Sequence, residues 1–276
     1  AGGAVAARAG LVGEGRVADV LIAVLFVLFA WWGSTGVILL MDGLPRWTFR
    51  FSLGGMTALA LLGLYGLFAT ANMESRAGAY GAFASALLVW AWHELTFLLG
   101  VITGPRKDPC PPDASGWQRF RYATATVLHH ELALFATLLV VVGLTYGAPN
   151  QVGTGTFLVL WTMRLSAKLN LFLGVRNFTS DFIPAHLRYL LSYFRMARLN
   201  PLMPVSLGAA GIVVVRLCGD ALAADAALFV QVGRTIVATI LGLAMLEHLF
   251  LVLPVPDDLL WRWALRGGHG SGAAPK

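Results

Sequence analysis

Charged residues are scarce in this chain of 276 residues: they make up 12% of it, whereas hydrophobic residues make up 58%. An ordinary soluble domain carries about twice that share of charge, so a soluble globular fold is excluded. Cysteine is also scarce. Cys110 and Cys218 stand far apart and form no CxxC pair, which excludes a disulfide framework and a zinc site. Alternating ten-residue segments are missing too, and this excludes a transmembrane β-barrel.

Basic residues outnumber acidic ones, with 20 Lys and Arg against 14 Asp and Glu and a formal net charge of +6. In a soluble protein such an excess would suggest a nucleic-acid partner. Here no lysine-rich tract and no patch of interleaved basic and aromatic residues accompanies it. Basic residues concentrate in the cytoplasmic loops of membrane proteins, so topology explains the excess and no nucleic-acid partner is expected.

Long apolar runs are abundant instead. A bilayer crossing needs about 20 apolar residues, and Gly, Pro and Asn clusters separate runs of this length. The first run follows Arg8 and Arg16 and lacks an A-x-A cleavage site, so we interpret it as a retained helix. The pattern predicts one polytopic all-α membrane domain over residues 1–276, a seven-transmembrane-helix bundle with spans at about 18–41, 52–72, 79–103, 120–146, 154–175, 205–223 and 229–253.

Seven spans place the two termini on opposite sides of the membrane. The 1–17 segment and the connections after the second, fourth and sixth spans hold three Lys or Arg residues, whereas the other side holds thirteen. If Arg216 and Arg234 are assigned to the side with three, its count of Lys and Arg residues rises only to five. The side richer in basic residues is cytoplasmic. We therefore expect an outer, periplasmic N-terminal tail over 1–17 and a cytoplasmic tail over 255–276.

The connection between the fifth and sixth spans contains "TSDFIPAHLRYLLSYFRMARL". Ser180 or Asp181 can cap a helix just before Pro184, which suits a first helical turn. The leucines and phenylalanines that follow share one stripe, and the arginines lie off it. This pattern predicts a cytoplasmic interfacial amphipathic helix over 181–199, with its arginines toward lipid phosphates.

Three of the five glutamates lie inside predicted spans, each next to a histidine. Burying one such charged group costs ~3 kcal/mol or more on insertion scales, so the retention of three is not accidental. The fifth span adds two cations and an amide. The residues concerned are His93, Glu94, His130, Glu131, Glu247 and His248, together with Arg164, Lys168 and Asn170.

The depth of these residues in the membrane is similar. Glu94 lies twelve residues before Arg106, and Glu131 lies ten residues after Arg121. Lys168 and Glu247 stand at comparable offsets from the cytoplasmic ends of their own spans. At ~1.5 Å per residue, these offsets agree within about one helical turn. Four helices are therefore predicted to bring ionisable groups to one level in the cytoplasmic half of the membrane, at a single shared site.

Three interpretations of this site are open. It is a buried network of ion pairs, in which Arg164 and Lys168, four residues apart on one helix face, neutralise two glutamates. Or it is a dinuclear iron or manganese centre, which takes carboxylate and imidazole ligands from several helices, although the usual Glu-x-x-His spacing is absent. Or a histidine is the axial ligand of a tetrapyrrole such as bacteriochlorophyll; the candidates are His93, His129, His130 and His248.

Five motifs occur in order over about residues 90–254: "WHELTFLLGVITGPRKDPCPPDASGW", "HELALF", "GAPNQVGTGTFLVLWTMRLSAKLNLFLGVRN", "DFIPAHLRYLLSYF" and "LEHLFLVLP". Together they resemble the photosynthetic complex assembly proteins of the PuhE type, the photosynthetic complex assembly protein 2 family. The resemblance marks the His-Glu pairs and the polar residues of the fifth span, but not His129, which we expect to be a bystander. It also marks an interfacial loop with Asn177, Asp181 and His186.

The resemblance implies a protein of the inner, photosynthetic membrane of purple-type phototrophic bacteria. Its implied role is assembly of the reaction centre and core antenna, through handling of pigment or nascent subunits and modulation of bacteriochlorophyll supply. The implied partners are reaction centre or core antenna subunits and bacteriochlorophyll. One alternative is a metal-dependent intramembrane oxidoreductase acting on a lipophilic tetrapyrrole, quinone or carotenoid, with Arg164 and Lys168 balancing charge or binding the substrate's acidic group. Another is a permanent accessory subunit of the reaction centre complex.

Overall fold

A computed structural model describes residues 2–178, 183–198 and 200–253. In this part the chain is all-α, apart from one isolated bridge between Val175 and Met196. Seven α-helices and two 3-10 helices follow one another as α1 (Gly2–Asp42), η1 (Arg46–Thr48), α2 (Phe49–Thr70), α3 (Arg76–Leu98), α4 (Gly116–Leu144), α5 (Val152–Leu173), η3 (Ala185–Tyr193), α6 (Leu202–Leu222) and α7 (Leu228–Phe250).

Six helices of the described part are long and apolar enough to cross a membrane: α1 from Gly15, α2 together with η1, α3, α4, α6 and α7. The chain is therefore an integral membrane protein. Helix α5 has a similar length, 22 residues, but it is not in this set. It carries Arg164, Lys168 and Asn170, which lower its hydropathy.

The seven α-helices lie close to the predicted spans, with two differences at their ends. Helix α3 stops at Leu98 rather than near residue 103. Gly100 follows with a φ of 74°, a left-handed conformation that suits glycine and ends helices. At the other end of the chain, α1 is already helical from Gly2, so the predicted outer tail of 1–17 is a helical extension over the residues described. Neither proline nor a turn motif interrupts this segment.

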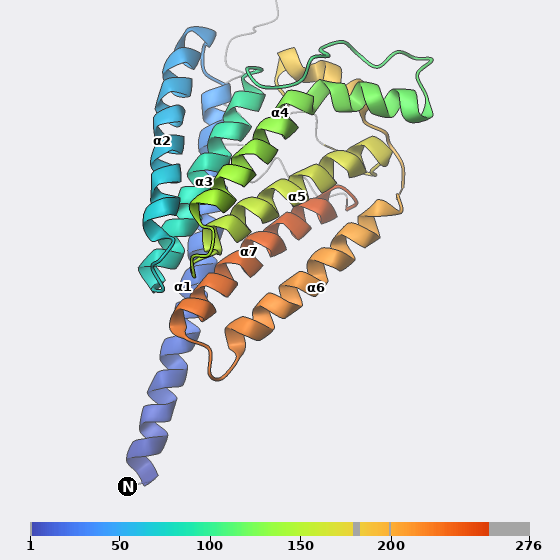
Figure 1. Ribbon diagram of the computed structural model, residues 1–276. Coiled ribbons are helices and arrows are strands. Elements are labelled where there is room, and N and C mark those ends of the chain that lie inside the picture. The colour runs from blue at the N-terminus through green and yellow to red at the C-terminus, as the bar shows by residue number, and fades with distance from the viewer. Residues whose placement is uncertain (1, 179–182, 199, 254–276) are drawn as a thin grey trace, which may run out of the picture.

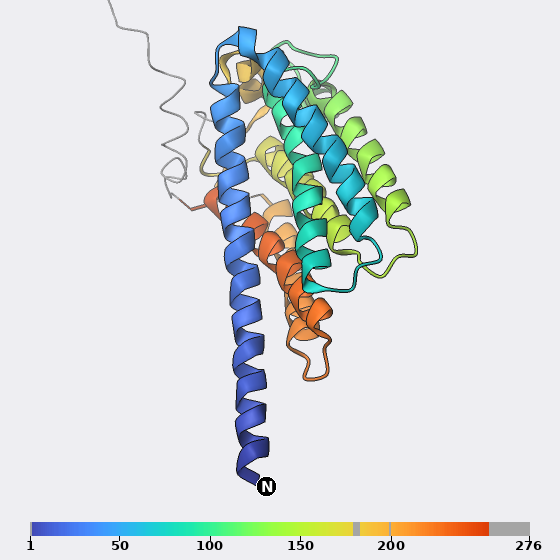
Figure 2. The same cartoon turned by 90° about the vertical axis from the view of Figure 1, so that its left-hand side faces the viewer.

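The helices form two sets of different inclination. In Figure 1, α2 and α3 stand nearly upright, whereas α5, α6 and α7 run obliquely beside them. Figure 2 shows that the N-terminal part of α1 extends well past the rest of the molecule. Helices α3 and α7 are central, since 56% of each span is buried, against 17% for α6.

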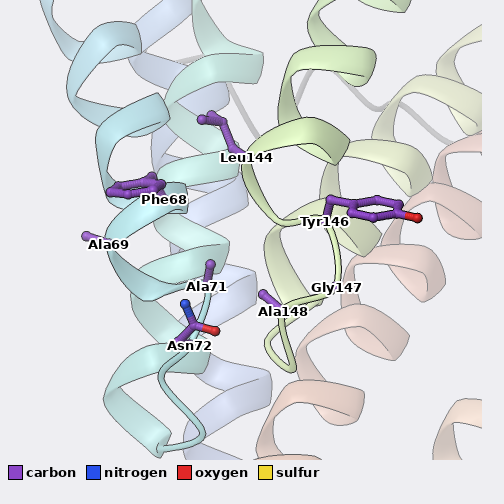
Figure 3. A pocket seen from close by; sticks show the side chains of 8 residues that line it. All are labelled: Phe68, Ala69, Ala71, Asn72, Leu144, Tyr146, Gly147 and Ala148. Carbon is purple, nitrogen blue, oxygen red and sulfur yellow. The ribbon is translucent and has the colours of Figure 1, made fainter.

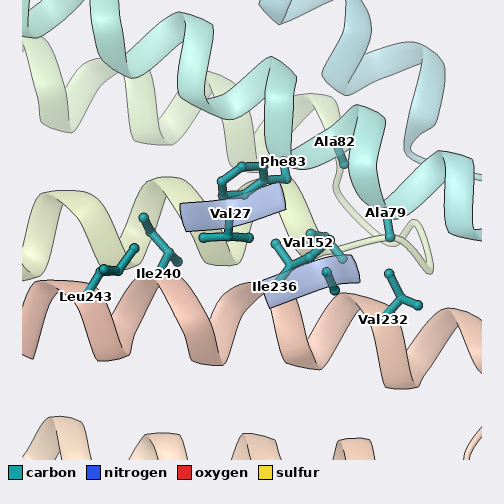
Figure 4. Packing of buried hydrophobic residues seen from close by; sticks show 10 residues of the cluster. Val27, Ala79, Ala82, Phe83, Val152, Val232, Ile236, Ile240 and Leu243 are labelled. Carbon is teal, nitrogen blue, oxygen red and sulfur yellow. The ribbon is translucent and has the colours of Figure 1, made fainter. Parts of the chain in front are cut away.

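A cluster of buried hydrophobic side chains holds the central helices together. Val27 of α1, Phe83 of α3, Val152 of α5 and Ile236 of α7 all belong to it (Figure 4). Small residues let neighbouring helices approach, which is the usual means of packing in lipid. A Cβ on Gly66 of α2, for example, would lie 2.2 Å from the Ser85 hydroxyl of α3.

The segment predicted as an interfacial α-helix over 181–199 is a 3-10 helix in its described part, η3. This is a correction to its type and length. A 3-10 helix repeats every three residues, so residues i, i+3 and i+6 share one edge. Leu187, Leu190 and Tyr193 follow this spacing and are the buried residues of η3, while Arg188 and Arg195 are exposed.

Candidate functional site

Helix α4 bends part of the way along its length, and its first turns run sideways before the rest descends (Figure 1). The backbone of the α3–α4 connection lies against this bend. The His130 N–H donates to the Thr103 carbonyl (2.8 Å), and the Ala125 carbonyl accepts from the Arg106 N–H (3.2 Å). A group inserted beside the helical hydrogen-bond ladder is a known cause of kinks. The bend sets the direction in which His130 and Glu131 enter the bundle.

Gly104 makes this close approach possible. A Cβ at Gly104 would lie 2.1 Å from the Ala125 carbonyl oxygen and 2.6 Å from the Thr126 carbonyl oxygen. Both neighbours are backbone atoms, so no side-chain rotation can make room. The sequence analysis missed this residue, and the only signal for it is a glycine before Pro105 in a long connection.

Two ion pairs join α5 to its neighbours. The Arg164 Nη2 lies 2.9 Å from Glu94 Oε2 on α3, and the Lys168 Nζ lies 2.5 Å from Glu131 Oε1 on α4. Trp161 Nε1 donates to the other Glu131 oxygen at 3.1 Å. The carboxylates are 12% and 17% exposed. Arg164 and Lys168 thus neutralise one glutamate each, which matches the network interpretation of the sequence.

The third glutamate, Glu247 of α7, adds a further charge near these two ion pairs. Its Oε1 accepts a hydrogen bond from Trp31 Nε1 of α1 at 3.1 Å, and it also interacts electrostatically with Arg164. Glu247 is exposed. The charged layer therefore extends from α4 through α5 and α3 to α7 and α1, with three carboxylates facing two cations.

His93 and His130 occupy the interior beside the ion pairs. Each is 1% exposed, and their ring centroids are 6.2 Å apart. His93 Nε2 is hydrogen-bonded to Thr137 Oγ1 at 2.9 Å, and the His130 ring lies 4.7 Å from that of Phe97. The Nδ1 atoms of both have no hydrogen-bond partner in the part of the chain described.

His248 belongs to a second, neutral polar cluster. Its Nε2 lies 3.0 Å from the Ser166 hydroxyl of α5, which donates to Ser206 of α6 at 2.9 Å. Asn170 Nδ2 donates to the Ser166 carbonyl at 2.9 Å. Asn200 Nδ2 donates to the Gly174 carbonyl at 2.7 Å. This cluster ties α5, α6 and α7 together beside the ion pairs, and sequence analysis missed Ser166, Ser206 and Asn200 as its members.

The loop residues singled out in the sequence bind helix ends. Asn177 Nδ2 donates to the Phe250 and Leu253 carbonyls at the end of α7, at 3.1 and 3.0 Å. His186 Nε2 donates to the Leu98 carbonyl at the end of α3, at 2.8 Å. Both satisfy carbonyls that a helix leaves unpaired. Asp181 lies outside the described residues.

A cap of aromatic and basic residues closes the cytoplasmic end predicted from the charge count. Arg106 Nε donates to the Tyr193 hydroxyl at 2.7 Å, and this bond raises the pKa of Arg106. Arg119 donates to the Tyr193 carbonyl and lies 4.4 Å from the Phe172 ring. Partial burial lowers the pKa of His186 and raises that of Tyr189. The cap fixes η3 to the connection that bends α4.

The arrangement can hold charge inside the membrane, but it does not gather a metal-ligand set. No group of three or more His, Cys, Asp or Glu side chains in residues 2–178, 183–198 and 200–253 is placed to hold an ion. The six residues predicted as ligands are divided between cationic, aromatic and hydroxyl partners. His129 joins neither cluster; it is exposed on the outer face of α4.

A pocket of about 470 Å³ lies elsewhere, at the C-terminal end of α2 and the α4–α5 connection. Phe68, Asn72 and Tyr146 are among its lining residues (Figure 3). Tyr146 is 87% exposed. Leu144, also in the lining, is about 20 Å along α4 from Glu131. This pocket is therefore separate from the charged layer.

The fold and site define an integral membrane protein whose helices are tied together by ion pairs and polar clusters. The chain belongs to the family described as "Protein of unknown function (DUF3623)", whose model matches residues 17–270. It is similar to a Rhodobacter capsulatus protein, "Uncharacterized 30.4 kDa protein in puhA 5'region", at 40% identity over 249 residues, which cover 88% of this chain and 90% of the relative. No solved structure matches the chain.

Proposed function

We propose that this protein is an assembly factor for the photosynthetic reaction centre and core antenna, acting within the membrane on pigment or nascent subunits. The observation that carries the proposal is the relative's name, which places that protein in the 5' region of puhA. The motif resemblance to the PuhE-type assembly proteins points to the same process. A role in modulating bacteriochlorophyll supply follows from that resemblance.

The membrane arrangement that goes with this function has seven spans in the bacterial inner membrane. Helix α5 is the seventh span: its length of 22 residues equals that of α2, and Glu94 and Glu131 neutralise its two cations. The N-terminus is periplasmic and the C-terminus cytoplasmic, because the connections that hold Arg106, Arg119 and Arg188 are the basic ones. Segment η3 lies at the cytoplasmic interface.

The side-chain contacts favour an accessory role over a catalytic one. A catalytic acid or base must have access to a substrate, whereas Glu131 and Lys168 bind each other and are 17% and 22% exposed. By contrast, the outer helices expose broad apolar surfaces, for example Leu25 and Phe29 on α1 and Ile212 and Val215 on α6. Such surfaces suit contacts with lipid, pigments and other transmembrane helices.

A metal-dependent intramembrane oxidoreductase is the second candidate. The observation in its favour is the pair of buried imidazoles, since the Nδ1 atoms of His93 and His130 and the Oε1 of Glu94 lack hydrogen-bond partners among the described residues. An iron or manganese ion held there would supply redox chemistry. Metal analysis of purified protein, repeated on His130→Asn, tests this candidate; stoichiometric metal that falls with the substitution would support it.

Deletion and complementation test the assembly function. Loss of the gene is expected to lower the amount of reaction centre and core antenna in membranes, measured by near-infrared absorption, while transcript levels of their subunits stay unchanged. The gene restored on a plasmid should return the complexes to the original level. Unchanged complex levels in the deletion strain would refute the assembly function. Stoichiometric recovery of the protein in purified, mature reaction centres would instead identify a permanent subunit.

A further inference from the structure

One histidine of the membrane-embedded part faces outward. His93, His130 and His248 are each 1% exposed, whereas His129 is exposed and makes no hydrogen bond to any described residue. Beyond Arg121, the other exposed residues of α4 are all apolar. An unsatisfied polar group away from water costs about 1–3 kcal/mol. The imidazole is therefore expected to meet a partner from outside the chain.

Small side chains flank His129 along α4. Ala125 and Ala133 stand four residues before and after it, and Ala136 stands seven after it. Helix residues three and four apart are neighbours on one face, so the methyl groups of Ala125 and Ala133 and the exposed side chain of Leu132 flank the imidazole. A planar molecule can approach the helix closely there, with its centre at the ring nitrogen. A leucine at either alanine position would hold it away.

We propose that this face of α4 binds a magnesium tetrapyrrole of the bacteriochlorophyll class, with a His129 ring nitrogen as the axial ligand of the metal. The choice of pigment rests on the proposed function. The magnesium holds four ring nitrogens in plane and takes a fifth ligand from one side, which a single imidazole supplies. The apolar macrocycle covers the alanines, and its tail lies along exposed side chains such as Leu132 and Leu139.

The buried histidines fit this role less well. His93 and His130 are enclosed by α3, α4 and their aromatic neighbours, and a macrocycle could reach their nitrogens only if these helices separated. His248 already uses both ring nitrogens, in hydrogen bonds to Ala244 and Ser166. His129 alone among the four combines an exposed imidazole with a surface on which a tetrapyrrole can lie.

A pigment titration tests this binding site. The protein is purified from a host that makes no bacteriochlorophyll and titrated in detergent with bacteriochlorophyll a, followed by the shift of its long-wavelength band. We expect one pigment per chain and binding at least ten-fold weaker in His129→Leu. Ala133→Leu should weaken binding similarly although it keeps the imidazole. Ile212→Ala, on the exposed face of α6 and outside the proposed surface, is the control and should bind like the original chain.

Thermal unfolding of each variant checks that the fold is kept, which is expected for His129→Leu because it places an apolar residue on an apolar face. Equal binding by the original chain and His129→Leu would overturn the proposal, as would preferential binding of haem or capture of a transmembrane helix in place of pigment. Complementation separates this outcome from failure of the assembly function. If the original gene restores the complexes but the protein binds no pigment through His129, the proposed pigment site fails and the assembly function stands.

Discussion

Replacing Gly104 by alanine is expected to destabilise the protein through the bend in α4. The added Cβ would lie 2.1 Å from the Ala125 oxygen and 2.4 Å from the Thr126 carbonyl carbon, so the connection must move away by about 1 Å or more to reach ordinary contact. That movement breaks the hydrogen bond from His130 to Thr103 (2.8 Å) and the one from Arg106 to Ala125 (3.2 Å).

The magnitude follows from these two bonds. Each backbone bond contributes about 0.5–1.5 kcal/mol, and a buried group left without a partner costs about 1–3 kcal/mol. Thr103 and His130 are buried, so a total loss of about 3 kcal/mol is expected. For a chain of this size, that loss corresponds to a fall in Tm of about 6–12 °C.

Thermal unfolding in detergent, with hydrogen exchange at the His130 amide, measures this effect. Gly143→Ala is a control, because Gly143 lies in α4, the helix that Gly104 contacts, and a Cβ there would meet nothing within 4 Å. We expect the control to be neutral or slightly stabilising. A Tm of Gly104→Ala within about 2 °C of that of the control would refute the claim that the close approach at Gly104 holds the bend.

Three further predictions concern the charged layer, the cap and the topology. Glu131→Gln leaves Lys168 unpaired and should lower the free energy of unfolding by about 3 kcal/mol. The double variant Glu131→Gln/Lys168→Met should recover most of that loss. A double-mutant cycle in thermal unfolding that shows no coupling would contradict a stabilising contribution of the pair. Burial and the nearby charges of Arg46 and Lys107 lower the pKa of His186 below its usual 6.5. Below that pH the unfolded chain therefore binds more protons than the folded chain, and the free energy of unfolding should fall as the pH drops below about 6.5. His186→Asn should flatten this part of the stability–pH curve, and an unchanged slope would exclude His186 as its source. Cys110 is a free cysteine of the basic α3–α4 connection. In a Cys218→Ser background, a membrane-impermeant maleimide should therefore label Cys110 in inside-out vesicles only. Labelling of intact, right-side-out cells would contradict the proposed topology.

The sequence by itself determined the membrane class and the positions of the helices. A scarcity of charge and runs of about 20 apolar residues leave few other structures possible in lipid, and the seven predicted spans agree with the α-helices within a few residues at most ends. The cost of burying charge also pointed to the residues that form the ion pairs, because Glu94, Glu131, Arg164 and Lys168 stand out against an apolar background.

Only the tertiary structure decided which residues meet. Adjacent residues on a helix point about 100° apart, so the sequence could not show that Glu131 pairs with Lys168 while His130 turns toward Phe97. It also could not show that Gly104 lies against α4, since contacts between a loop and a helix leave no periodic signal. His129 and His130 have the same chemistry in sequence. His130 is buried and His129 is exposed, because adjacent residues on a helix point about 100° apart.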